Sequence, residues 1–185
     1  ELAAQGAGNT QPRPIRTVTY HVELGERHRL VGVEFKGNRY FSSEMLSGRL
    51  KIQPAAYASA GRYSSTLLQD DVASIRTLYD ANGFHEIDVQ SQLVDDYQGH
   101  QGDLFVRFDI KEAQQTRVAD LVLDGNQRLS TEELSGVIGS SKGQPYSDFN
   151  ISSDRDNILA LYFDQGFSEA HFSADVEKLS PAGSD

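Results

Sequence analysis

Apolar and polar residues alternate along two stretches of the chain, at residues 86–93 and 169–176. A period of two puts successive side chains on opposite faces of a β-strand, so each stretch predicts a strand with one buried face. Residues 30–35 and 104–110 predict two further strands. The apolar positions of the two alternating stretches are Ile87, Val89 and Leu93, and Ala170, Phe172, Ala174 and Val176.

A helical period appears between these strands. Apolar residues spaced by four, three and four positions share one helical face, and they predict a long helix before each alternating stretch. A shorter helix is expected ahead of each long one. Ser42 or Ser43 can cap the first, and Ser130 and Glu133 have the spacing of a capping box for the second. The apolar positions of the long helices are Leu68, Val72, Ile75 and Tyr79, and Ile151, Ile158, Leu161 and Tyr162.

The same elements occur twice in the same order. Residues 18–38 align with residues 106–126 at an offset of 88 without a gap, and both segments end in Gly-Asn. Farther along, the offset becomes 83, because the first copy has five extra residues near positions 54–59. A repeat of this length predicts tandem copies of one small structural unit.

The predicted fold class is α+β, with tandem βααββ modules in which two helices cover one face of a small mixed three-stranded sheet. We expect a disordered linker at residues 1–16, the last strand of a preceding module at 17–24, a complete module at 27–112, a second module lacking its third strand at 115–178, and a disordered tail at 179–185.

The assignment of residues 17–24 rests on the alternation of Val18, Tyr20, Val22 and Leu24. An incomplete sheet exposes an unpaired strand position. We therefore hypothesise that this segment fills the vacant third-strand position of a second module, either in a neighbouring molecule or by folding back on its own chain.

Composition narrows the function classes. The net charge of −10 provides no basic footprint for nucleic acid. The absence of cysteine excludes a disulfide framework, a thiolate metal site and a cysteine nucleophile. No apolar run approaches the ~20 residues that a membrane-spanning helix needs.

No residues show catalytic or metal-ligand spacing. His85 and Glu86 are adjacent, and adjacent strand residues face opposite sides, so a surface histidine is the better interpretation. The aspartate pairs at residues 70–71 and 95–96 lack calcium-loop spacing and are interpreted as solvated charges. Residues 136–142 lack the Gly-Lys-Ser ending of a phosphate-binding loop. We expect no enzymatic activity and no cofactor.

The ordered set of repeated residues resembles the POTRA (polypeptide-transport-associated) domain, and tandem copies resemble most the barrel-assembly (BamA-like) branch of outer-membrane proteins. The resemblance covers residues 17–178 and implies a periplasmic array that precedes a membrane β-barrel. The residues that carry it are Val33, Phe35, Gly37, Asn38, Phe41, Ser42, Gly61, Tyr63, Tyr79, Gly83, Phe84 and Val89, with Leu121, Leu123, Gly125, Asn126, Leu129, Ser130, Gly143, Tyr146, Tyr162, Gly166, Phe167 and Phe172 in the second copy.

The resemblance also implies a site. In the family the second strand lies at a sheet edge, where an extended polypeptide can pair with it by β-augmentation. An ordinary edge kept soluble by polar side chains is an equally good interpretation for any single strand. The implied client-binding edges are Glu86, Ile87, Asp88, Val89, Gln90, Ser91, Gln92 and Leu93, and Glu169, Ala170, His171, Phe172, Ser173, Ala174, Asp175 and Val176.

The expected function is to bind client polypeptides and to scaffold partners for outer-membrane β-barrel protein assembly. The implied partners are unfolded outer-membrane or secreted polypeptides, accessory assembly proteins and, through residues 18–24, another copy of the chain. A POTRA segment of a two-partner secretion transporter, which exports one dedicated client, is the alternative. A small α/β enzyme and a structural spacer are further alternatives.

Overall fold

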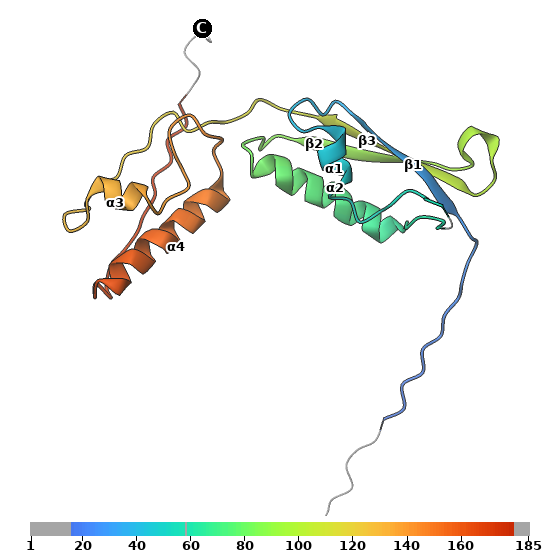
Figure 1. Ribbon diagram of the computed structural model, residues 1–185, viewed down its shortest axis with the longest axis horizontal. Helices are drawn as coiled ribbons and strands as arrows, with labels where there is room; N and C mark the ends of the chain where they lie inside the picture. The colour runs from blue at the N-terminus through green and yellow to red at the C-terminus, as the bar shows by residue number, and fades with distance from the viewer. Residues whose placement is uncertain (1–15, 58, 180–185) are drawn as a thin grey trace, which may run out of the picture.

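The computed structural model describes residues 16–57 and 59–179. We call residues 27–112 the first module and residues 115–178 the second module. The expected linker and tail lie outside the described residues, except for Arg16 and Leu179. The elements, shown in Figure 1, are β1 (Arg29–Lys36), α1 (Ser43–Ser47), α2 (Ser65–Asp80), β2 (Asp88–Val94), the 3₁₀ turn η1 (Tyr97–Gly99), β3 (Asp103–Lys111), α3 (Thr131–Ser135) and α4 (Asp148–Asp164).

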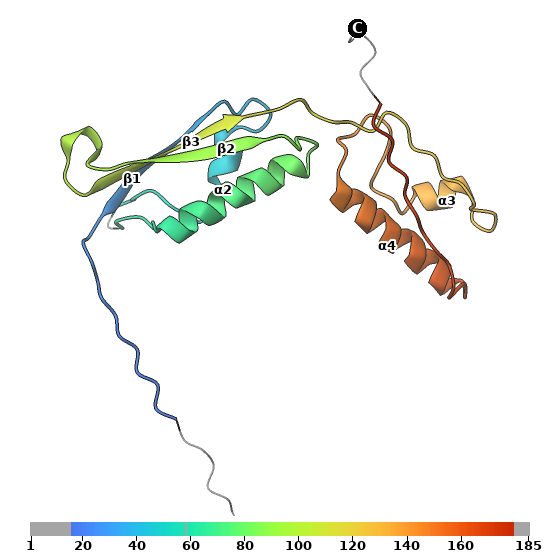
Figure 2. The same ribbon diagram turned by 180° about the vertical axis from the view of Figure 1, so that it is seen from behind.

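The last strand of the first module is the centre of its sheet. The strand order is β1-β3-β2, with β1 parallel and β2 antiparallel to β3. Figure 2 shows α1 and α2 on the same face of this sheet. The predicted α+β class, with a mixed three-stranded sheet covered by two helices, is confirmed. Because β1 and β2 each pair only with β3, neither outer strand would have a sheet neighbour without it.

The core of the first module lies between the sheet and α2. Every second residue of β3 is buried, and these side chains point at the helices. The predicted face of α2 is also confirmed, since Leu68, Ile75 and Tyr79 are buried and Val72 packs beside them. The fully buried apolar members of the core are Leu30, Leu46, Ile52, Tyr79, Val89, Val106 and Phe108.

Capping serines set the starts of the helices. Ser42 accepts a hydrogen bond from the Met45 backbone N–H at the start of α1. The predicted capping box of α3 is present, with Ser130 and Glu133 bonded to each other's backbone N–H groups. These hydrogen bonds satisfy N–H groups that have no partner within the helix. The serine patterns in the sequence therefore locate both short helices.

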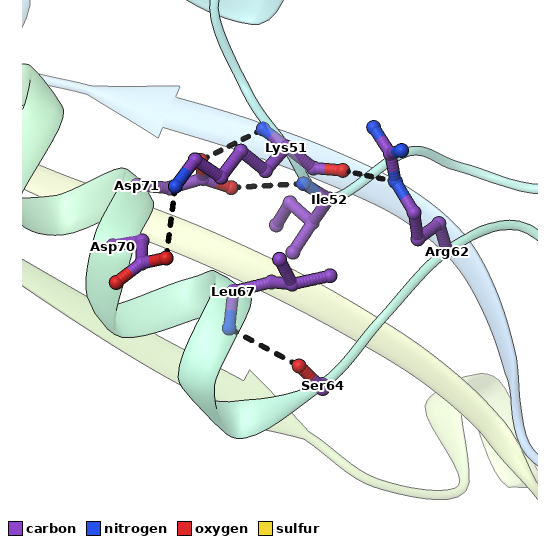
Figure 3. Close-up of polar contacts among 7 residues, drawn as sticks. All are labelled: Lys51, Ile52, Arg62, Ser64, Leu67, Asp70 and Asp71. Carbon is purple, nitrogen blue, oxygen red and sulfur yellow. Dashed lines mark hydrogen bonds and ion pairs between the residues drawn. The ribbon is translucent and has the colours of Figure 1, made fainter. Parts of the chain in front are cut away.

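Asp71 contradicts its interpretation as a solvated charge. It is only 1% exposed. Its carboxylate accepts the backbone N–H groups of Lys51 at 2.7 Å and Ile52 at 2.9 Å, as Figure 3 shows. The neighbouring Asp70 fits the solvated interpretation and pairs only with the Lys51 ammonium group, at 2.9 Å. The buried carboxylate thus ties α2 to the segment that follows α1.

The second module has two helices and a smaller core. Leu129, Leu134 and Ile158 are buried, and Leu123, Tyr162 and Phe172 pack against them. The described part of this module contains no strand, only an isolated bridge between Arg117 and Pro145. The strand predicted at residues 169–176 is therefore wrong for this chain. In the first module, β3 joins the two outer strands, and no described segment takes that central place in the second.

The segment at residues 18–24 forms no strand within the described chain, and its assignment to a preceding module stays a prediction. It has no regular secondary structure, and Val18, Tyr20, Val22 and Leu24 are each at least two-thirds exposed. The described part of the chain provides no pairing partner for it. The hypothesis that it folds back onto the second module of its own chain is therefore wrong, and pairing with another copy stays a prediction.

The turn after α2 connects the two modules. Gly83 has a φ of +86°, which favours glycine, and its carbonyl accepts the Thr116 N–H at 2.8 Å. A Cβ at Gly83 would collide with the Thr116 carbonyl oxygen. The Thr116 carbonyl in turn accepts the Tyr146 N–H at 2.9 Å. The chain between the modules is thus held on both sides by backbone hydrogen bonds.

Candidate functional site

Strand β2 presents one free edge. It pairs with β3 over seven residues, from Asp88 opposite Lys111 to Val94 opposite Phe105, and no strand of the described residues lies on its other side. Outer-strand N–H and C=O groups that point away from the sheet are open to another extended chain. The first implied edge is therefore a real sheet edge, although Glu86 and Ile87 lie before the strand begins.

The backbone groups on that free edge can be identified. A Cβ at Gly37, just after β1, would collide with the Ile110 carbonyl oxygen, so this carbonyl points toward β1 and away from β2. Val89 is opposite Ile110. The pair is therefore of the type that exchanges no hydrogen bonds, and the backbone groups of Val89 point away from β3. In a regular strand, those of Ser91 and Leu93 point the same way.

A groove runs along this edge between α2 and β2. It has a volume of about 770 Å³, and α2 and β2 together form its walls. The α2 positions Gln69, Val72, Ala73 and Arg76 recur at helical spacing, so they form one stripe along the helix. Figure 2 shows α2 running alongside β2. The remaining lining residues are Thr77, Val89, Gln90 and Ser91.

The helix-facing side of β2 is covered only at its start. Val89 is fully buried, but Ser91 and Leu93, which share its face, are exposed, and Leu93 is 41% exposed. The expectation that Leu93 belongs to a continuous buried face is therefore wrong. α2 leaves this part of the strand open, so apolar side chains of an added strand would meet the exposed Leu93 and the partly exposed Val72.

One helix side chain contacts the free edge directly. The Arg76 guanidinium donates to the Val89 carbonyl at 2.7 Å. The sequence does not single out Arg76, since an arginine at an exposed helix position is typical of a solvated face. Its position one turn after Val72, on the stripe beside the predicted edge strand, was the available signal.

The opposite face of the sheet carries ion pairs beside the stacked rings of Tyr97 and Phe105. Arg107 on β3 bonds to Glu34 on β1 at 2.8 Å, which lowers the pKa of the Glu34 carboxyl and raises the pKa of Arg107. Asp88 lies 3.4 Å from the Lys111 ammonium group. Gln90 donates to Asp88 at 3.1 Å. These side chains satisfy one another, so the groove side of β2 is the better candidate for binding an apolar segment.

The second implied edge has a different setting. Residues 169–176 are not in a strand, and among them only Ala170 and Phe172 are partly buried. At the repeat offset, Arg76 corresponds to Leu159, and Val72 corresponds to Arg155, which pairs with Asp156 at 2.8 Å. The described structure therefore brings together an edge, a groove and a cation in the first module only.

Titratable clusters elsewhere are small. The His85 ring lies 2.7 Å from the Asp80 carboxylate and 5.4 Å, centroid to centroid, from the Tyr146 ring. Within residues 16–57 and 59–179, no group of three or more His, Asp or Glu side chains is placed to hold a metal ion. Among the described helices, none combines the length and the hydropathy that a membrane-spanning helix requires.

A known protein family matches most of the chain. The family described as POTRA, surface antigen variable number repeat, matches residues 29–113 and 116–185. A putative outer membrane protein assembly factor of Treponema pallidum (strain Nichols) is 23% identical over 164 residues, which cover 87% of this chain and 20% of that protein. The chain therefore spans about a fifth of the length of the curated relative that it matches.

Solved structures resemble the chain at low identity. Haemophilus influenzae BamA POTRA3-5 is 19% identical with a TM-score of 0.49, over 80% of this chain and 59% of that one. POTRA1-2 of the periplasmic domain of Omp85 from Anabaena is 16% identical with a TM-score of 0.41, over 80% and 85% of the two chains.

Proposed function

Because the chain belongs to the POTRA family, we propose that it lies in the periplasm as part of a bacterial outer-membrane protein and binds extended client polypeptides at the free edge of β2. The client would add a strand to the sheet by β-augmentation. In this role the chain would also scaffold accessory partners during the assembly and insertion of outer-membrane β-barrel proteins. The single observation that carries the proposal is the open edge of β2 beside the groove along α2.

Backbone pairing suits a site that must accept many clients. The outward N–H and C=O groups of Val89, Ser91 and Leu93 would bond to any extended segment, whatever its side chains. The partly apolar stripe on α2 would contact every second side chain of that segment. The backbone edge would accept many sequences, and the groove would favour segments in which apolar residues alternate. A receptor for unfolded β-barrel proteins needs both properties.

The proposed activity is the binding of polypeptides, with no catalysed reaction. The groove is lined by amide, hydroxyl and aliphatic side chains and one guanidinium, with no carboxylate, imidazole or other base beside a nucleophile. We therefore propose a role in holding and transferring polypeptides. Export of one dedicated client by a two-partner secretion transporter would use the same edge, and competition between unrelated client peptides distinguishes the two roles.

Residues 18–24 suggest a second mode of association. We propose that this segment is the last strand of a preceding module and that it can also pair with another copy of the chain. Its alternating apolar side chains are exposed here, with Tyr20 at 86% and Leu24 at 93%. Sedimentation of the wild type and of Val22→Asp over a range of concentrations tests the exchange. A monomer at all concentrations for both proteins would contradict it.

A proline on the edge tests the client site. Ser91 is the suitable position, because its N–H faces outward and its side chain is exposed, whereas Val89 is fully buried. A proline at an outward-facing position removes one donor and spares the pairing with β3. Ser91→Pro should weaken binding of a fluorescent peptide with alternating apolar residues by roughly fivefold, the equivalent of one hydrogen bond.

The matched control is Ser91→Ala, which keeps the N–H and should bind the peptide as the wild type does. Circular dichroism and thermal unfolding establish that both variants are folded. Equal affinity of a folded Ser91→Pro protein and the wild type would mean that clients do not use this edge.

A further inference from the structure

The free edge of β2 is partly occupied by the protein itself. Arg76 donates to the Val89 carbonyl at 2.7 Å, and this carbonyl is one of the outward groups that an added strand would use. A client N–H approaching Val89 would meet the guanidinium first. The contact therefore blocks one position of the edge while leaving Ser91 and Leu93 open.

Among the described residues that line the groove, Arg76 is also the one that carries a charge. The other lining residues carry amide, hydroxyl or aliphatic side chains. Within the described parts of the chain, no carboxylate lies within ion-pair distance of Arg76. The groove thus offers a cation without an ion-pair partner, on a chain whose net charge is −10. An arginine forms stronger hydrogen bonds with a carboxylate than with a neutral carbonyl.

We propose that Arg76 is a latch on the client-binding edge, which opens for extended segments that carry an aspartate or glutamate beside Val89. The incoming strand takes the Val89 carbonyl with its own N–H. The displaced guanidinium then binds the carboxylate of a client side chain that points toward α2. This inference rests on the proposed function and adds a selectivity to it.

The second module provides an internal contrast. At the position equivalent to Arg76 it has Leu159, and its equivalent stripe contains the ion pair of Arg155 with Asp156. A guanidinium already paired with a carboxylate has little to gain from another one. The latch is therefore a property of the first module, and it makes the two modules unequal in client choice.

The test uses two short synthetic peptides that alternate apolar and polar residues and differ only at one central position, glutamate in one and glutamine in the other. NMR spectra of the isotope-labelled chain are recorded as each peptide is added. The changes in backbone amide chemical shift show where each peptide binds and how tightly. The wild type should bind the glutamate peptide roughly fivefold more tightly than the glutamine peptide, as expected for one partly exposed ion pair. The preference should shrink at high salt.

Arg76→Met removes the charge and the donors while keeping a long side chain and a good helix former. It should abolish the preference for glutamate. It should also bind the glutamine peptide at least as tightly as the wild type does, because no guanidinium has to be displaced. If Arg76 made only an ordinary structural contact, the substitution would weaken the binding of both peptides.

The matched control is Arg62→Met. Arg62 also donates to a backbone carbonyl, that of Lys51 at 2.6 Å, but it lies in the loop before α2, as Figure 3 shows. This variant should keep the full preference for glutamate.

Three results overturn the latch. If both peptides shift β2 amides with equal affinity, or if Arg76→Met keeps the preference, the edge binds clients without the latch. If neither peptide shifts the amides of β2, the edge is not a client site, and the proposed function fails together with this inference.

Discussion

Asp71 on α2 and Asp154 on α4 hold the same position in the two modules, and each buried carboxylate accepts two backbone N–H groups from the segment before its helix. Asp154 bonds to Gly139 at 2.6 Å and Ser140 at 3.1 Å. Asp71 bonds to Lys51 at 2.7 Å and Ile52 at 2.9 Å. Hydrogen bonds to a buried charged group stabilise a fold by about 1.5–3 kcal/mol each. This pairing is a structural repeat of the fold and not a site.

Asp71→Asn should therefore destabilise the first module. An amide offers one acceptor oxygen and turns an N–H donor toward the other backbone N–H, so we expect a loss of about 2–3 kcal/mol in the free energy of unfolding. Urea unfolding measures it. The neighbouring Asp70→Asn removes only an exposed pair with Lys51 and should change stability by less than ~1 kcal/mol. Equal effects of the two substitutions would contradict the role of Asp71.

The Tyr79 hydroxyl is expected to contribute to stability through Glu112. It donates to Glu112 at 2.7 Å, and the same carboxylate oxygen accepts the N–H groups of Arg39 and Tyr40. Tyr79→Phe should cost about 1 kcal/mol of unfolding free energy. Tyr162→Phe is the control, since the described structure gives no hydrogen bond to the Tyr162 hydroxyl. Thermal unfolding that shows the larger loss for Tyr162→Phe would refute this assignment.

The Tyr146 hydroxyl should ionise at an unusually high pH. It donates to Asp148, and this hydrogen bond, with a smaller contribution from burial, raises the pKa of Tyr146 from 10 to about 12. A raised pKa favours neutral tyrosine in the folded state, so its contribution to stability is present below pH 10 and is lost as the pH rises toward 12. Carbon NMR of the tyrosine rings measures the titration. Asp148→Asn should lower the pKa, and an unchanged value would contradict the hydrogen bond.

The junction between the modules should depend on Gly83. Gly83→Ala forces a Cβ toward the Thr116 carbonyl and a strained φ of +86°. Gly166→Ala has the same strain, with a φ of +87°, but nothing lies within 4 Å of its Cβ. The strain costs about 1 kcal/mol in both variants, and only Gly83→Ala should also change the relative orientation of the modules. Small-angle scattering compares the two, and identical profiles would refute a specific junction.

The elements of the first module were largely readable from local patterns. The α2 face, the three strands and the capping serines follow from side-chain periodicity and residue chemistry within short windows. The strand order cannot be predicted from such patterns. No local pattern indicates that the last strand inserts between the first two, and only the family resemblance predicts the edge position of β2.

The features that the sequence does not predict correctly all depend on tertiary neighbours. Residues 169–176 have the alternation of a strand, but a strand requires a neighbour to accept its backbone hydrogen bonds, and alternation does not supply one. The sequence does not predict the burial of Asp71, because burial depends on what α2 packs against, although its repetition as Asp154 is a usable signal. Arg76 could be placed at the edge only once α2 and β2 lay side by side.

The most direct test of client binding is to map the surface that a client contacts. The isotope-labelled chain is titrated with an alternating apolar peptide, and the backbone amide shifts of the first and second modules are followed. The account predicts that the largest changes fall on β2 and on the α2 stripe from Gln69 to Arg76. Changes centred on β1 or on the second module, with β2 unaffected, would contradict it.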